Sequence, residues 1–155
     1  MPRTSKVGKT AGTTTPSLAY LIGRLDRILR HAIDTAVRGH GLTVAQYTTL
    51  SVLGAGTPLS NAQLARRSLV TPQAMNEVLL ALEGRALVRR NARPDNGRIL
   101  QTRLTAKGRT ILAECDAEVA ALEAKMLGAM PASERTQLRK LVIRCSRTLL
   151  DVPGD

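Results

Sequence analysis

The apolar positions that follow Ser17 repeat at intervals of three and four residues, which is the spacing along one face of an α-helix. These positions are Leu18, Leu21, Ile22, Leu25, Ile28, Leu29, Ala32 and Ile33. Ser17 is a suitable N-cap residue, and the segment Gly39-His40-Gly41 is typical of a helix end. The pattern therefore predicts a first amphipathic helix that ends near residue 39.

Two capping boxes predict the next two helix starts. In this motif a Ser or Thr hydroxyl accepts a hydrogen bond from the backbone N–H three residues later, where a Gln or Glu reaches back. The two boxes are formed by Thr43 with Gln46 and by Ser60 with Gln63. They predict a helix at about 43–54 and a short helix at about 60–67, separated by glycines and a proline.

A fourth helix is predicted to begin at Thr71, an N-cap residue followed by proline at the first helical position, and to end near residue 84. The pattern then changes to two strand-like runs, at 87–90 and 99–104. The dipeptide Asn96-Gly97 between them is typical of a tight hairpin turn. This part of the chain predicts a β-hairpin.

Two more helices are predicted after the hairpin. Thr105 caps a long alanine-rich helix of about 105–128, Pro131 interrupts the pattern, and a last helix covers about 133–150. The apolar residues on one face of the last helix are Leu138, Leu141, Val142, Cys145 and Leu149.

A short helix, a three-residue link, a further helix and a basic hairpin, in this order, are the pattern of a winged helix-turn-helix. The predicted fold is mainly α with a small β wing. We expect four parts: a disordered basic arm at 1–16, a dimerisation helix at 17–40, a DNA-binding head at 41–104 and C-terminal dimerisation helices at 105–151. The helices outside the head have apolar stripes that need a cover, which favours a homodimer.

The composition favours a polyanionic partner. The 155 residues include 23 Lys and Arg against 12 Asp and Glu, and residues 59–109 hold ten of the basic and three of the acidic side chains. Only Tyr20 and Tyr47 are aromatic, which argues against single-stranded nucleic acid because its binding proteins usually stack bases on aromatic rings. Double-stranded DNA is therefore the predicted partner. No apolar run approaches the ~18 residues of a membrane span and no signal peptide is evident, so we expect a cytoplasmic protein without membrane contact.

The predicted second helix of the helix-turn-helix would place its N-terminal residues against base edges in the major groove. Asn and Gln each offer a donor and an acceptor to adenine, Ala can contact a thymine methyl group, and hairpin arginines suit a minor groove. The candidate DNA-binding residues are Arg66, Arg67, Thr71, Gln73, Ala74, Asn76, Glu77, Arg90, Arg93 and Arg98. Of these, Arg66 and Arg67 are expected to contact phosphates. The apolar residues of the same helix are expected to pack inward: Met75, Val78, Leu79 and Leu82.

Other functional classes find little support in the sequence. It contains no P-loop, no dinucleotide-binding fingerprint and no nucleophile elbow. The four candidate zinc ligands, His31, His40, Cys115 and Cys145, are too widely spaced for a typical zinc site. Both cysteines are interpreted as small apolar residues of the dimer helices rather than as redox switches. We therefore expect no enzyme activity, no metal and no cofactor.

Several segments of the chain resemble the MarR family of transcriptional regulators. They are residues 41–47, 64–65, 82–83, 87–90 and 97–98 and the run Leu104-Thr105-Ala106-Lys107-Gly108, and the resemblance extends over about 18–150. The wing tip of the family has the pattern Asp-x-x-Asp-x-Arg, of which this chain keeps only Arg98. Glu77 is a second departure, because many members have arginine, another basic residue or an uncharged residue at this position.

The resemblance implies a homodimer with interleaved terminal helices and two winged heads on a palindromic operator. It also implies a repressor that is released by a small lipophilic or phenolic effector, bound between the head and the dimer helices. The alternative is a winged-helix protein-interaction module without specific DNA binding. Retention on heparin or on random-sequence DNA would distinguish the two.

Overall fold

The computed structural model describes residues 15–93 and 96–150, and it contains every predicted helix and both predicted strands in the predicted order. The elements are α1 (Leu18–Arg38), α2 (Val44–Gly54), β1 (Leu59–Ser60), α3 (Asn61–Ser68), α4 (Pro72–Gly84), β2 (Val88–Arg93), β3 (Asn96–Leu104), α5 (Ala106–Leu127) and α6 (Ala132–Leu150). The predicted arm at 1–16 lies almost entirely outside the described residues.

Side-chain hydroxyls fix the helix starts as the sequence predicted. Five N-cap residues each accept a hydrogen bond from a backbone N–H of the first turn: Ser17, Thr43, Ser60, Thr71 and Thr105. Both predicted capping boxes are formed, with Gln46 and Gln63 bonded back to the cap residues. These starts depend only on neighbours in the sequence, so the local pattern was sufficient to predict them.

The three strands form an antiparallel sheet in the order β1-β3-β2. The sequence did not predict β1, because a strand of two residues has no periodicity of its own and Ser60 is at the same time the N-cap of α3. The prediction of an Asn-Gly turn was wrong: Arg93 pairs with Asn96, so Asn96 and Gly97 belong to β3. The register of the β2–β3 ladder shifts after Ala92. Ala92 pairs with Leu100 but the next residue, Arg93, pairs with Asn96, so residues 97–99 of β3 have no partner on β2. Glycine at such a bulge is common because it tolerates irregular backbone.

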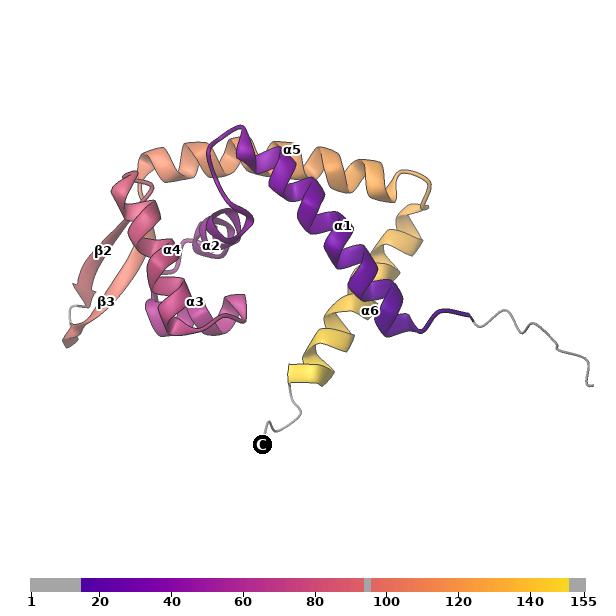
Figure 1. Cartoon of the computed structure of the whole chain (residues 1–155), viewed down its shortest axis with the longest axis horizontal. Coiled ribbons are helices and arrows are strands. Elements are labelled where there is room, and N and C mark those ends of the chain that lie inside the picture. The colour runs from indigo at the N-terminus through magenta and orange to yellow at the C-terminus, as the bar shows by residue number, and fades with distance from the viewer. Residues whose placement is uncertain (1–14, 94–95, 151–155) are drawn as a thin grey trace, which may run out of the picture.

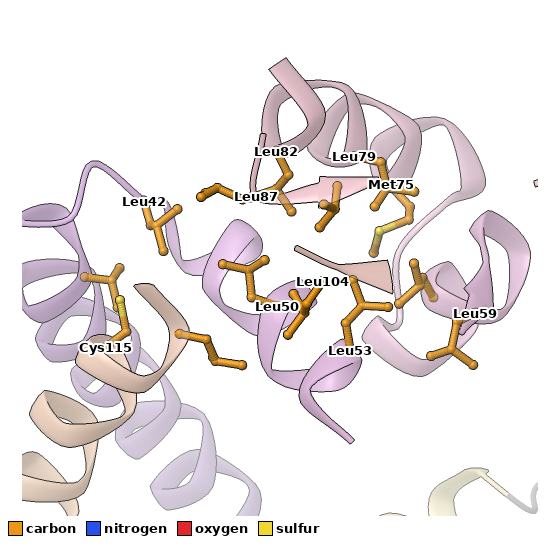
Figure 2. Packing of buried hydrophobic residues seen from close by; sticks show 14 of the residues in the cluster. Leu42, Leu50, Leu53, Leu59, Met75, Leu79, Leu82, Leu87, Leu104 and Cys115 are labelled. Atoms are coloured by element: carbon orange, nitrogen blue, oxygen red, sulfur yellow. The ribbon is translucent and has the colours of Figure 1, made fainter. Parts of the chain in front are cut away.

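A continuous apolar core joins the head to the first half of α5 (Figure 2). Its buried side chains from the head include Leu50 of α2, Leu64 of α3, and Leu79 and Leu82 of α4. Cys115 of α5 belongs to the same cluster. The head and the start of α5 therefore pack as one unit.

The junction between β2 and α5 is held by an unusually close backbone approach at Gly108. A Cβ at this position would overlap the carbonyl oxygen of Leu87. The same carbonyl accepts a hydrogen bond from the Thr105 backbone N–H at 3.1 Å, and the Thr105 hydroxyl donates mainly to the neighbouring Ala86 carbonyl at 2.7 Å, with the Leu87 carbonyl at 3.2 Å. The segment Leu104-Thr105-Ala106-Lys107-Gly108 thus has a structural role: it locks the wing base to the first turn of α5.

The outer helices leave large apolar surfaces uncovered. In Figure 1, α5 runs along the top of the molecule, α1 extends away from the head and α6 descends from the far end of α5. Every residue of α6 is exposed in the single chain, and Val37 is the only buried residue of α1. None of the described helices is long and apolar enough to cross a membrane.

Candidate DNA interface

The N-terminal half of α4 is amphipathic, as predicted: one side faces solvent and the opposite side packs into the core. Gln73, Ala74 and Glu77 are exposed. The apolar face packs into the core, with Met75, Leu79 and Leu82 buried and Val78 half-buried. The hydroxyl of Thr71 accepts the N–H of Ala74 at 3.2 Å. Thr71 therefore has a capping role in addition to its predicted place at the DNA surface.

Arg90, a predicted DNA contact, has its guanidinium bonded within the single chain. Its Nε and Nη2 donate to Glu83 Oε2 at 2.9 and 2.6 Å, and its Nη1 donates to Asn76 Oδ1 at 3.2 Å. The Arg90 side chain is only 16% exposed. It therefore anchors the wing to α4, and the predicted minor-groove contact would require these bonds to break.

The same bond constrains how Asn76 can recognise a base. Its carbonyl oxygen accepts from Arg90, which leaves the amide N–H groups as donors. The predicted two-bond contact with adenine would require this bond to break. Gln73 is exposed and makes no side-chain hydrogen bond to the described part of the chain, so it is better placed for base recognition.

The link between α3 and α4 has a defined geometry that the sequence did not reveal. Leu69 ends α3 in the left-handed conformation with φ of 54°, and the Val70 N–H donates to the Ala65 carbonyl. The side chain of Asn61 donates to the Pro72 carbonyl at 3.0 Å, which ties the start of α3 to the start of α4. These bonds fix the position of α4 relative to α3.

Basic side chains flank the exposed face of α4. Arg66 and Arg67 are exposed in the last turn of α3, where a positive charge also favours the helix C-terminus. Arg98 is exposed on β3 near the wing tip. The side chain of Arg93 lies outside the described residues. The wing and α3 thus place positive charge on two sides of α4, an arrangement suited to the two grooves and backbone of a duplex.

A polar junction between the head and α5 was missed by the sequence analysis. His40, which follows α1, contacts Glu114 at 3.3 Å and Glu118 at 2.9 Å. The Tyr47 hydroxyl donates to Asp116 Oδ1 at 2.9 Å, and burial raises the pKa of this phenol. Their partners are about 70 residues away in the chain, so no local pattern could have indicated them. In the described part of the chain, no group of three or more His, Cys, Asp or Glu side chains is arranged to hold a metal ion.

The two cysteines lie in different environments. Cys115 is buried in the core, as expected for a small apolar residue, whereas Cys145 is exposed on α6 in the single chain. Burial raises the pKa of the Cys115 thiol, and the nearby carboxylates of Glu118, Asp116 and Glu114 raise it further. Because only the thiolate is nucleophilic, Cys115 is unsuited to redox sensing at neutral pH.

Cys115 is therefore expected to resist alkylation in the folded protein. In a Cys145→Ser variant at pH 8, iodoacetamide should label the remaining thiol at least tenfold more slowly than in the same protein unfolded in guanidinium. Mass spectrometry of timed samples measures both rates. Equal rates in the two conditions would contradict the buried, protonated state of Cys115.

Comparison with known proteins agrees with this arrangement. A model of the MarR family matches residues 40–99. The HTH-type transcriptional repressor Rv2887 of Mycobacterium tuberculosis is 37% identical over 125 residues, which cover 81% of this chain and 90% of the relative. The solved complex of Rv2887 with DNA matches at a TM-score of 0.70 and 34% identity over 84% of this chain and 98% of that one. Rv2887 in complex with salicylic acid matches at a TM-score of 0.69 and 35% identity, over 85% and 98% of the two chains.

Proposed function

The chain belongs to the MarR family of transcriptional regulators, and we propose that it represses transcription by binding double-stranded DNA through α4 and the wing. The observation that supports this function most directly is the exposed face of α4 with Gln73, Ala74 and Glu77, in a head whose α3 and β3 also expose arginines. The relative Rv2887 has been solved in complex with DNA. On this surface Gln73 is the main base-contacting residue, and the carboxylate of Glu77 suits the amino group of cytosine.

DNA binding by this surface should depend strongly on salt. Each phosphate that a Lys or Arg neutralises contributes about 0.9 to the slope of log affinity against log salt concentration. Binding of random-sequence duplex is therefore expected to show a slope of several units, and Arg98→Ala should lower it by about one for each head of the dimer in contact with DNA. Fluorescence anisotropy at several salt concentrations measures the slope.

The matched control is Arg139→Ala, which removes the same charge from an exposed position on α6 and should leave the slope unchanged. A flat salt response of the unmodified protein would contradict the proposal. That result would favour the alternative, a winged-helix module that binds a protein partner without binding DNA.

The uncovered helices support a homodimer in which α1 and α6 of two chains pack together. The large apolar side chains exposed on these two helices are Leu18, Tyr20, Leu21, Ile22, Leu25, Ile28, Leu138, Leu141, Val142, Ile143, Leu149 and Leu150. So large an apolar surface is rare on a monomeric protein. A two-fold dimer would cover it and would present two copies of α4 to a palindromic operator. In this arrangement, 17–40 and 105–151 are the dimerisation segments and 41–104 is the head.

The protein is accordingly expected to sediment as a dimer at micromolar concentration. Ile22→Glu places a charge on the exposed apolar face of α1 and should shift the population toward monomer. Sedimentation velocity measures both. A monomer in the unmodified protein, or an undisturbed dimer in the Ile22→Glu variant, would contradict this assignment.

The comparisons also suggest the class of effector. Rv2887 has been solved with salicylic acid and with p-aminosalicylic acid, both of which are small aromatic carboxylates. We extend this chemistry to the present chain: a small carboxylate releases the repressor from DNA. Release of a bound duplex on addition of salicylate tests this part of the proposal.

A further inference from the structure

A hollow of about 180 Å³ at the base of the wing is lined by arginines from three elements. They are Arg89 of β2, Arg103 of β3 and Arg109 of α5. The apolar part of the wall comes from Leu53 at the end of α2 and from Leu104. Along β2, Arg89 alternates with Arg90, so the hollow lies on the face of the hairpin opposite the Arg90 anchor.

The positive charge of this hollow is not neutralised within the described part of the chain. Arg89 and Arg103 are direct partners across the β2–β3 ladder, an arrangement in which like charges destabilise a sheet. None of the ion pairs in the described residues involves these two side chains or Arg109. In the sequence, residues 84–113 contain eight basic side chains and one acidic one, Asp95. A bound anion would relieve this repulsion.

The exposed side chain of Arg109 is tied by one hydrogen bond to the wall of the hollow. Its Nη1 donates to the Leu104 carbonyl at 3.3 Å, which holds the guanidinium at the hollow and leaves other N–H groups for a ligand. Guanidinium groups bind carboxylates through two parallel hydrogen bonds, and Leu53 and Leu104 offer an apolar surface beside them. The volume is below the ~300–1,000 Å³ of typical ligand pockets, which limits the ligand to a small molecule.

We propose that this hollow binds a small organic carboxylate, with the carboxylate among Arg89, Arg103 and Arg109 and the apolar body of the ligand against Leu53 and Leu104. The ligand would connect the end of α2, the wing base and the first turn of α5. Arg89 is four residues from Arg93, or about 13 Å along the strand, so the site is separate from the wing tip. It would therefore act by fixing the wing base, and this regulatory role depends on the proposed function.

The binding step can be tested without DNA. Isothermal titration of the full chain with salicylate should show binding that Arg89→Gln/Arg103→Gln weakens at least tenfold. Lys125→Gln, a charge loss at the far end of α5, is the control and should change the affinity less than twofold. Equal affinities in the unmodified protein and the double variant would overturn the proposal. Inorganic phosphate at matched ionic strength should bind more weakly than salicylate, and equal binding would overturn the carboxylate assignment.

A second measurement needs no variant. In protein with ¹⁵N-labelled arginine, salicylate should shift the Nε–Hε signals of Arg89, Arg103 and Arg109. The signal of Arg24 on α1 serves as the internal reference and should not move. Shifts confined to arginines outside the hollow would place the ligand elsewhere and overturn the proposal.

Titration with DNA separates this site from the DNA interface. The double variant should keep the salt slope of the unmodified protein and lose its response to salicylate. A slope lower by about two for each head of the dimer would identify Arg89 and Arg103 as phosphate contacts and overturn the proposal. If salicylate releases DNA equally from both proteins, the effector site lies elsewhere and only this inference fails. If neither protein binds DNA, the proposed function fails, whereas the titration without DNA still tests the hollow.

Discussion

Replacement of Gly108 by alanine is expected to destabilise the protein by about 3–5 kcal/mol, a large part of the roughly 5–15 kcal/mol that holds a typical domain folded. The new Cβ would overlap the Leu87 carbonyl group, whose carbon lies 2.9 Å from the position of that Cβ. The obstacle is backbone, so no side-chain rotation can remove it. Relief requires α5 to move away from Leu87, which breaks both hydrogen bonds from Thr105 to that carbonyl.

Urea denaturation followed by circular dichroism measures this loss. The matched control is Gly84→Ala at the end of α4, where a Cβ meets no atom within 4 Å and the backbone has no positive φ. Since alanine has the higher helix propensity, the control should be unchanged or more stable by up to about 1 kcal/mol. Equal denaturation midpoints for the two variants would show that the contact between Gly108 and Leu87 is not close in solution.

Gln73→Ala is expected to weaken binding of the specific operator by about 1–3 kcal/mol for each half-site, because a lost base contact typically costs this much. With one copy of α4 on each half-site of the proposed dimer, the total loss would be about 2–6 kcal/mol. Gln73 is exposed and takes no part in capping, so the variant should fold normally. Binding of a scrambled duplex, which depends on phosphate contacts, should be nearly unchanged.

Anisotropy titrations of operator and scrambled duplex at the same salt concentration separate the two effects. Gln137→Ala, on the exposed surface of α6, is the matched control and should bind both duplexes as the unmodified protein does. Equal losses on the two duplexes would contradict a base-contacting role for Gln73. Asn76→Ala is a less specific probe, since it also removes a hydrogen bond from the Arg90 anchor of the wing.

The helix starts and the winged helix-turn-helix order were predictable from the sequence because their causes are local. A capping box connects residues three apart, and the apolar face of α4 follows from the helical period. The same local reasoning predicted that Gln73, Ala74 and Glu77 would be exposed and that Met75 and Leu79 would be buried. Glycine and proline in the segment after α2 likewise marked the break before α3.

The tertiary structure decided which of the basic side chains are bonded within the chain and which are left for a ligand or DNA. From sequence, Arg90 was a candidate DNA contact and its neighbour Arg89 was not; in the fold, Arg90 is bonded to Glu83 and Asn76, while Arg89 faces Arg103 across the sheet. This difference depends on the strand register and on how α4 packs against the wing. The short β1 strand and the contacts of His40 also join distant parts of the chain. Local periodicity determines the face on which a side chain lies, whereas only the packing of distant segments determines what that face meets.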